Sequence, residues 1–197
     1  MAVTRPRTRD PGRKQRILAS AAALSARYGF RSISMTDIGS HAGIVGSGIY
    51  RHFDSKTSIL VAMLDQGMAR LADRAAEIIA AGDDPGHTLA ELVRDHIAAA
   101  IENRDVLAVY HMEANTLPEE DLRRLRRAQR HYVEEWVHQL APLRTDLADA
   151  ELRLAVHAAI GAIQSTLFYR SGLADDRQAA LLQVIAHACL GIAPPAR

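Results

Sequence analysis

A glycine-rich turn between two short helical stretches places the strongest constraint on how this chain folds. Residues 42–56 read AGIVGSGIYRHFDSK, in which Gly43, Gly46 and Gly48 interrupt a sequence otherwise rich in Ala, Leu, Arg and Glu. Glycine adopts the left-handed backbone of a sharp turn without the strain that a side chain causes. The segment therefore predicts that one helix ends at Gly43 and that another begins near Gly46.

The residues before this turn predict two helices, of which the second is the one that ends at Gly43. Apolar residues recur at the spacing of one helical face over residues 12–28, and Gly29 then favours a stop. Ser34 followed by Asp37 has the form of a helix N-cap, so a short helix is predicted over residues 35–42. A supporting helix and a short second helix are thus expected ahead of the glycine turn.

The helix after the turn is predicted over residues 46–53, with Ile49 and Phe53 directed inward because they lie one helical turn apart. Two short helices joined by a glycine-containing turn, with a supporting helix before them, form a helix-turn-helix. Its second helix fits the major groove of DNA. The residues then left toward solvent or nucleic acid are Val45, Ser47, Gly48, Tyr50, Arg51 and His52.

The rest of the chain predicts only further helices. The β-branched and aromatic clusters between turn residues that are typical of strands are missing, so the fold class is all-α, with about nine helices. With 48 % hydrophobic residues the chain can bury a core, and the single cysteine, Cys189, excludes an intramolecular disulfide. The additional helices are expected over residues 56–81, 87–103, 105–115, 118–140, 149–170 and 175–190.

Charge divides the chain into two predicted domains. Residues 1–56 hold ten Lys and Arg against three Asp and Glu, a balance of +7, whereas residues 57–197 hold fourteen against twenty, a balance of −6. A basic module attracts polyanions. We therefore predict a DNA-binding domain with a basic N-terminal arm at residues 1–56, and a helical effector-binding and dimerisation domain at residues 57–197. A solvated basic tail would explain residues 5–16 but not the helices that follow.

The start of the chain imitates a secretory signal peptide, because basic residues precede the apolar run ILASAAALSA. That run is ten residues long, contains Ser20 and Ser25, and places its apolar residues on one helical face. No run approaches the roughly 18 apolar residues of a membrane span. The protein is therefore expected to be cytoplasmic, with no membrane partner.

At residues 34–56 the chain resembles the TetR family of transcriptional regulators. The family's DNA-binding signature, S-x-x-D-I-x-x-x-A-G-(I/V)-x-x-x-x-(I/L)-Y-x-H-F-x-S-K, is filled here by Ser34, Asp37, Ile38, Ala42, Gly43, Ile44, Ile49, Tyr50, His52, Phe53, Ser55 and Lys56. The chain departs at Val45, Gly46 and Gly48, where members usually have a serine, a longer polar residue, and a threonine or alanine. The glycines weaken the predicted helix, and our hypothesis is that they let its backbone approach DNA closely.

The resemblance implies how this segment contacts a double-stranded operator. Tyr50, His52 and Lys56 contact phosphates, Thr36 lies near the DNA backbone, and the start of the helix together with Arg51 meets base edges. By side-chain chemistry, Ser47 and Arg51 are the best hydrogen-bonding readers, and Val45 can touch a thymine methyl group. The predicted DNA-binding residues are Thr36, Val45, Gly46, Ser47, Gly48, Tyr50, Arg51, His52 and Lys56.

The last two predicted helices carry small and apolar residues on more than one face. Such helices pack closely on a copy of themselves, but a buried hairpin within one chain has the same pattern. The resemblance favours a homodimer, since members dimerise through a four-helix bundle made by their last two long helices. Two copies would read the half-sites of a pseudo-palindromic operator. The predicted interface consists of Ala155, Ala158, Ala159, Ala162, Ile163, Leu181 and Ile185.

A regulatory ligand is also implied by the resemblance, which places an effector pocket inside the C-terminal domain. The apolar character of this part of the chain suggests a small, lipophilic molecule. The chain is thus expected to be a repressor that such a ligand releases from DNA. By position, the pocket candidates are Met63, Met68, Val109, Met112, Trp136 and Phe168, and an ordinary core position is the alternative for each.

Other activities find little support in the sequence. No nucleophile elbow, phosphate-binding loop or nucleotide-binding glycine pattern occurs, so no enzyme, catalytic residue or cofactor is predicted. Histidines and glutamates over residues 131–138 share one helix, but without Cys ligands or an HExxH pattern no metal site is predicted. The arginines of residues 123–130 suit helical ion pairs better than a second nucleic-acid patch. A helical ligand-binding or adaptor protein without sequence-specific DNA binding remains the rival function.

Overall fold

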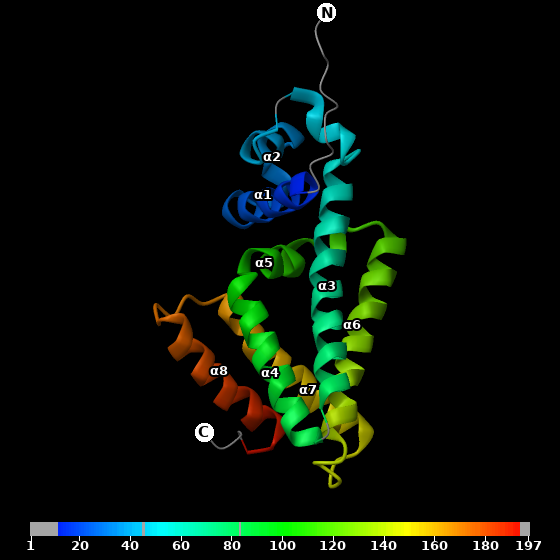
Figure 1. Cartoon of the computed structure of the whole chain (residues 1–197), viewed down its shortest axis with the longest axis vertical. Coiled ribbons are helices and arrows are strands. Elements are labelled where there is room, and N and C mark those ends of the chain that lie inside the picture. The colour runs from blue at the N-terminus through cyan, green and yellow to red at the C-terminus, as the bar shows by residue number, and fades with distance from the viewer. Residues whose placement is uncertain (1–11, 45, 83, 194–197) are drawn as a thin grey trace, which may run out of the picture. The chain divides into compact units, whose positions relative to one another are not determined.

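The computed structural model describes residues 12–44, 46–82 and 84–193 (Figure 1). Within these ranges the chain forms eight α-helices, α1 to α8, four short 3-10 segments and no strand, which confirms the all-α prediction. Two compact units divide the chain, residues 1–63 and 64–197. The division lies inside α3 (Lys56–Ala81), whereas the sequence placed the domain boundary at the beginning of this helix.

The smaller unit begins with α1 (Gly12–Tyr28), the supporting helix, whose bounds agree with the prediction. Gly29 ends it with a positive φ of 81°, a conformation that favours glycine. The 3-10 segment η1 (Phe30–Ser32) then returns the chain to the core through the buried ring of Phe30. The predicted stop at Gly29 is confirmed.

A capping box begins α2 (Met35–His41). The amide of Asp37 donates to the Ser34 hydroxyl oxygen at 3.1 Å, and the amide of Ser34 donates to the Asp37 carboxylate at 2.8 Å. These bonds satisfy amides that have no partner inside the helix. The Ser34 hydroxyl, which donates to the carboxylate at 2.7 Å, and the Ser34 amide hold the pKa of Asp37 below its usual value. The N-cap predicted from the sequence is confirmed.

The predicted third helix is instead a 3-10 segment, η2 (Gly46–Arg51). The α-helix expected over residues 46–53 is therefore wrong in type, and the physical reason lies in its composition. Glycine costs about 1 kcal/mol relative to alanine in an α-helix, and this segment has glycine at two of its six positions. So short a stretch gains too few α-helical hydrogen bonds to offset that cost, and the tighter 3-10 turn suits it.

The larger unit holds the rest of α3 and five further α-helices. Asp84 caps the first of them, because its carboxylate accepts the amide of His87 at 2.7 Å and Pro85 occupies the first turn. None of the helices in the described residues combines the length and apolar character needed to span a bilayer. The elements are α4 (Pro85–Glu102), α5 (Arg104–Glu113), η3 (Ala114–Thr116), α6 (Glu119–Leu140), α7 (Asp149–Gln164), η4 (Ser165–Leu167) and α8 (Asp175–Leu190).

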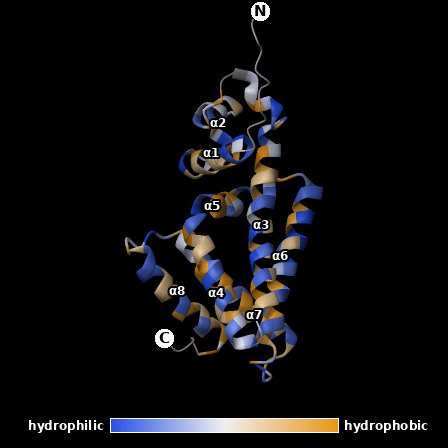
Figure 2. Cartoon of the chain, viewed as in Figure 1, coloured by the Kyte–Doolittle hydropathy of each residue, from blue (hydrophilic) through white to orange (hydrophobic). Residues whose placement is uncertain are grey.

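The core of the larger unit lies between α4, α6, α7 and α8. Helix α7 packs along α8, while α4 contacts both α6 and α8. Figure 2 shows hydrophobic residues alternating with hydrophilic ones along these helices, as expected where each has one face in a core. The largest side chains that are fully enclosed in this unit include Leu89, Trp136, Leu140, Ile163 and Leu190.

Helix α7 is shorter than the helix predicted over residues 149–170, because it ends at Gln164 and passes into η4. The hydroxyls of Ser165 and Thr166 donate to the carbonyl oxygens of Ala162 and Ile163 at 2.7 and 3.0 Å. Such local side-chain bonds compete with the helical backbone pattern. The prediction overran the helix because it did not weigh these two hydroxyls.

Ion pairs on α6 agree in part with the prediction. Arg123 pairs with Glu119 one turn earlier at 2.5 Å. Arg124 pairs with Asp121 at 2.8 Å and with Asp65 of α3 at 2.6 Å, rather than with the glutamate four residues before it. These arginines therefore have carboxylate partners within the larger unit.

Candidate nucleic-acid interface

The segment η2 is anchored by two buried side chains. Ile49 is 1 % exposed and Phe53 is 5 % exposed, as the sequence predicted for these two positions. The amides of His52 and Phe53 donate to the carbonyl oxygen of Ile49 at 2.9 and 3.1 Å, which fixes the end of η2. Tyr50, between the anchors, is 54 % exposed, so its phenol ring projects away from the core. This alternation holds the exposed side chains of η2 in fixed positions.

The turn between α2 and η2 depends on a glycine with positive φ. Gly43 has φ of 69°, and the amide of Ile44 then donates back to the carbonyl oxygen of Gly39 at 2.8 Å. Gly39 lies against Ile49, whose Cβ would be 3.6 Å from a Cβ at position 39. The backbone of α2 and the side chain of η2 are therefore in direct contact, as in a helix-turn-helix.

Gly48 has a reason inside the protein to lack a side chain. A Cβ atom placed at this residue would lie 2.9 Å from Cγ2 of Ile44, closer than real Cβ contacts occur. The sequence offered close approach to DNA as the reason for this glycine. The packing against Ile44 is a second reason, and it acts without DNA.

Lys56 makes contacts that its predicted role does not include. Its ammonium group donates to the carbonyl oxygens of Phe30, Arg31 and Ile33 at 2.9, 3.1 and 2.9 Å. It also lies 4.9 Å from the centre of the Phe30 ring. The first residue of α3 thus binds two backbone carbonyls of η1 and the carbonyl of Ile33, which directly follows η1. Sequence reasoning missed this clamp, because the partners are more than 20 residues away.

The other predicted DNA-binding residues lie on the surface of the smaller unit where they are described. Thr36, Ser47 and Arg51 are exposed and His52 is half-buried. Val45 lies outside the described residues, and Gly46 begins η2. Over residues 12–63 the sequence holds seven Lys and Arg against two Asp and Glu, a balance of +5. The surface that η2 presents therefore belongs to a positively charged unit, which attracts phosphate.

The predicted effector-pocket residues do not form one group. Met63 belongs to the smaller unit, and Met68 is half-buried against the core of the larger one. Val109 and Trp136 are fully enclosed, as the core alternative would have them. Met112 and Phe168 are 53 % and 74 % exposed, so neither is enclosed in the core, and their place in a pocket stays a prediction. The apolar periodicity of a helix shows which residues lie on its apolar face, but it does not show whether those residues line a cavity.

The predicted dimer-interface residues divide between core and surface. Ala159 and Ile163 are 0 % exposed within one protomer, so they have no accessible surface left for a partner, and the prediction is corrected for both. Ala155 and Ala162 are half-buried. Ala158, Leu181 and Ile185 are exposed, and the structure adds Leu154 and Val184 to the exposed apolar side chains of α7 and α8.

Comparison with known proteins places this geometry in a family. The HTH-type transcriptional repressor KstR2 of Rhodococcus jostii is 35 % identical over 106 residues, which are 54 % of this chain and 52 % of that protein. The chain thus matches about half the length of this curated relative.

Solved structures agree on the fold. A TetR-family regulator from Bordetella parapertussis superposes with a TM-score of 0.81 at 24 % identity, covering 91 % of this chain and 94 % of that one. AibR, whose crystal structure contains isovaleryl coenzyme A and operator DNA, has a TM-score of 0.76 at 19 % identity, covering 93 % of this chain and 100 % of that one.

Two family profiles match separate parts of the chain. The profile described as bacterial regulatory proteins, tetR family, matches residues 17–63, which contain most of α1, all of α2 and η2, and the beginning of α3. The profile described as tetracyclin repressor-like, C-terminal domain, matches residues 82–168. The chain belongs to the TetR family of bacterial regulatory proteins.

Proposed function

We propose that this protein is a dimeric repressor that binds a pseudo-palindromic operator through η2 and leaves it when a lipophilic ligand binds the larger unit. One observation carries the DNA-binding part of the proposal. Tyr50 and Arg51 are exposed and directly follow the buried anchor Ile49. Their segment packs against the capped helix α2, within a unit whose charge balance is positive. This arrangement can place exposed side chains against a DNA duplex, and the positive charge attracts its phosphates.

The contacts to DNA divide by chemistry. The Tyr50 hydroxyl and the His52 ring are assigned to phosphates, where a donor positions the protein but reads no sequence. Ser47 and Arg51 are assigned to base edges, since an arginine can donate two hydrogen bonds to a guanine. Thr36 lies at the start of α2 and is assigned to the DNA backbone. Val45 remains the candidate for a thymine methyl group, and Gly46 and Gly48 the candidates for close backbone approach.

The dimer is proposed to form through the exposed faces of α7 and α8. Leu154 and Ala158 lie one turn apart on α7, while Leu181, Val184 and Ile185 recur at helical spacing on α8. Leu154, Val184 and Ile185 are 70 %, 56 % and 46 % exposed, a set that is unusual on the surface of a monomer. Burying these faces against a twofold-related copy brings two reading segments to one operator.

Ligand control is proposed from the family and from the named relatives. KstR2 of Rhodococcus jostii is a repressor, and AibR was crystallised with both an acyl coenzyme A and its operator. For this chain we propose an effector of the same broad kind, with an apolar body. Such a ligand regulates only if it prefers one arrangement of the dimer over another.

The test is a DNA-binding titration across salt concentrations. The full-length protein is mixed with a fluorescent duplex from the region upstream of its own gene, and anisotropy is recorded between about 50 and 300 mM salt. If each protomer neutralises about four phosphates, log affinity falls with log salt at a slope near −7. A slope near zero, or equal binding to a scrambled duplex, leaves the adaptor alternative in place.

A pair of variants separates specific contact from general charge. Arg51→Met is expected to weaken binding to the cognate duplex at least about tenfold, because a base-reading arginine contributes about 1–3 kcal/mol. Arg127→Met removes an exposed arginine of the larger unit and is expected to leave the affinity unchanged. Equal losses in both variants would show that only net charge matters.

A further inference from the structure

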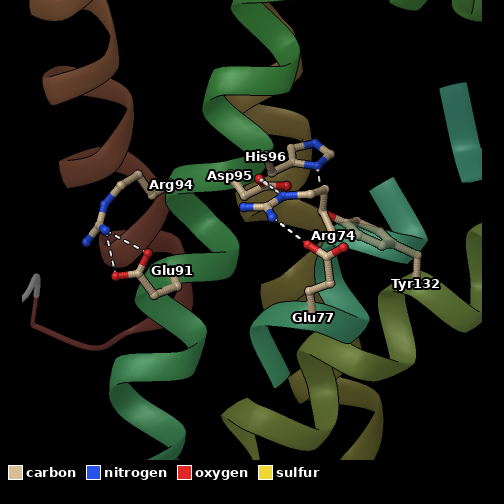
Figure 3. Close-up of polar contacts among 7 residues, drawn as sticks. All are labelled: Arg74, Glu77, Glu91, Arg94, Asp95, His96 and Tyr132. Carbon is tan, nitrogen blue, oxygen red and sulfur yellow. Dashed lines mark hydrogen bonds and ion pairs between the residues drawn. The ribbon is translucent and has the colours of Figure 1, made fainter. Parts of the chain in front are cut away.

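The core of the larger unit contains a chain of polar rings among apolar side chains. His96 of α4 and Tyr132 and Trp136 of α6 are at most 5 % exposed. Nδ1 of His96 lies 2.9 Å from the Tyr132 hydroxyl oxygen, and the two rings stack with centroids 5.7 Å apart. The Trp136 ring meets the His96 ring edge-on, with centroids 5.8 Å apart. Figure 3 shows His96 and Tyr132 facing each other from neighbouring helices.

The far side of His96 has no partner. Its Nε2 atom is fully enclosed and makes no hydrogen bond to any described residue, and the same holds for Nε1 of Trp136. The Trp136 ring is tilted against the Tyr132 ring with centroids 6.1 Å apart, but its N–H makes no hydrogen bond to the hydroxyl. A buried polar atom left in this state costs about 1–3 kcal/mol. An aliphatic residue at position 96 would avoid that cost.

The direction of the hydrogen bonds follows from these neighbours. Burial lowers the pKa of His96 to about 4, so its ring is neutral at pH 7 and carries one N–H. Burial raises the pKa of Tyr132, so its hydroxyl keeps its hydrogen, and Nδ1 of His96 is the hydrogen-bond partner that the described residues give it; we therefore assign that hydrogen to Nδ1. The remaining hydrogen of the imidazole is then on Nε2. His96 therefore presents a hydrogen-bond donor with no acceptor.

The charged groups beside this cluster are paired with each other. Arg74 donates to Glu77 at 2.5 Å and to Asp95 at 3.3 Å, and Figure 3 shows the three side chains next to His96 and Tyr132. The guanidinium of Arg74, which the structure places beside this cluster, is therefore already paired with carboxylates and is not offered to an anion at Nε2. A buried ion without a partner is costly, so an uncharged acceptor suits the site better than an anion.

We infer that His96 is the polar recognition point of the effector site, and that its Nε2–H donates to an uncharged carbonyl oxygen on a mainly apolar ligand. The inference rests on the proposed ligand-controlled function and gives it a ligand chemistry. The carbonyl belongs either to an acyl thioester or to a ring ketone, because both offer a neutral oxygen on an apolar skeleton. Tyr132 acts as a positioning residue, since it holds the imidazole through Nδ1 and touches no ligand in this scheme.

The chain supplies its own reporter for the test. Trp136 is the one tryptophan of the sequence and lies against the His96 ring. Its emission is recorded while the full-length protein is titrated with isovaleryl coenzyme A or with a steroid ketone. Three control arms lack the thioester or ketone carbonyl. Coenzyme A alone keeps its amide groups but has no acyl carbonyl, isovaleric acid is ionised to a carboxylate at neutral pH, and a steroid hydrocarbon has no carbonyl group. We expect a saturable change with at least one carbonyl probe and none with these three.

The decisive variant replaces both hydrogen-bonded partners together. His96→Leu with Tyr132→Phe removes this hydrogen bond together with the orphaned Nε2–H and leaves the Trp136 N–H without a partner, as in the parent, so the ligand-free protein is expected to keep or raise its melting temperature. Its affinity for the carbonyl probe, followed by the same emission and by thermal shift, is expected to fall at least about tenfold. His131→Leu, an exposed change beside Tyr132 on α6, is the matched control and keeps the parental affinity.

The inference would be overturned if the double variant bound the carbonyl probe with the parental affinity, or if it melted at a lower temperature while its response to the probe was unchanged. It would also be overturned if the parent protein responded to isovaleric acid, or if it responded to neither carbonyl probe. A crystal structure of the probe complex in which only a water molecule contacts Nε2 would also overturn the inference. Operator binding of the ligand-free protein is measured in parallel. If the protein binds its operator but does not respond to a carbonyl probe, the inferred ligand site is wrong and the DNA-binding function is retained. If the protein does not bind its operator, the proposed function itself is overturned.

Discussion

The ammonium nitrogen of Lys56 lies 2.9 Å from the carbonyl oxygen of Ile33. Together with the bonds to Phe30 and Arg31, this contact gives each of the three N–H groups of Lys56 a backbone acceptor. The lysine thereby joins the first turn of α3 to the segment that leads into α2. A phosphate contact, which the family resemblance implies, would require it to give up at least one of these bonds.

Replacing Lys56 by Met separates the two roles by their salt dependence. If Lys56 binds carbonyls, the variant loses about 2 kcal/mol of folding stability, in line with hydrogen bonds from a charged donor, and its DNA affinity falls with the salt slope unchanged. If it neutralises a phosphate in each protomer, the slope of the dimer falls by about 2. Urea denaturation measures the folding stability, and the anisotropy titration, carried out below the melting temperature, measures the salt slope. A smaller slope at full stability would refute the clamp.

Gly48→Ala is expected to destabilise the protein by about 1–3 kcal/mol, because the new Cβ overlaps Cγ2 of Ile44. Adding Ile44→Ala removes that atom and tests the cause. If packing is the whole reason for the glycine, the two changes interact in a double-mutant cycle, and the second one recovers DNA affinity relative to Gly48→Ala. Affinity that stays low after the packing conflict is relieved would instead support close approach of the backbone to DNA.

The capping box of α2 should give the smaller unit an acid-sensitive component of stability. Hydrogen bonds from Ser34 hold the pKa of Asp37 below its value in the unfolded chain, so the folded state favours the carboxylate. The resulting stability is present above the unfolded pKa of 3.8 and is lost as the pH falls through the lower folded value. Ser34→Ala is expected to cost about 1 kcal/mol at pH 7. Denaturation of this variant at pH 7 and below pH 3 checks the sign, since the difference from the parent should shrink in acid.

His96 should produce a second pH dependence at higher pH. Its folded pKa of about 4 lies below the unfolded value of 6.5, so the unfolded chain binds the proton more readily. Stability is then full above pH 6.5 and decreases toward pH 4, by up to about 3 kcal/mol at 1.36 kcal/mol for each pKa unit. The His96→Leu/Tyr132→Phe variant is expected to flatten this part of the stability profile. A parental slope in that variant would assign the effect to other groups.

The long helices could be predicted from the sequence because their signals are local. Apolar periodicity and a glycine stop gave the bounds of α1, and similar patterns gave those of α3 and α8. The type of η2 could not be predicted in this way. Glycines in a short segment weaken an α-helix, but the backbone adopted instead depends on how Ile49 and Phe53 fit the core.

The candidate sites depend on contacts between distant residues, and a single sequence gives little sign of them. Lys56 bonds to carbonyls at least 23 residues away, and His96 meets Tyr132 across 36 residues. Both lysine and histidine have common alternative environments, so their identity alone does not reveal these partners. Small residues on several faces of α7 likewise did not show that Ala159 faces the core while Ala158 faces solvent. A charged clamp and an orphaned ring nitrogen become visible only in three dimensions.

The dimer proposal predicts different outcomes for two exposed leucines. Leu154→Glu places a charge on the face of α7 that is proposed to meet its copy, so it should yield a monomer with operator affinity reduced at least about a hundredfold, because one reading segment replaces two. Leu143→Glu, in the connection between α6 and α7, is the matched control and should stay dimeric, since that residue lies outside the proposed interface. Light scattering coupled to size exclusion measures the mass, and parental helical content by circular dichroism with a cooperative thermal transition would show that both variants fold. A Leu154→Glu protein that remained dimeric would move the interface away from α7, and dissociation of both variants would show that the effect is not specific to this face.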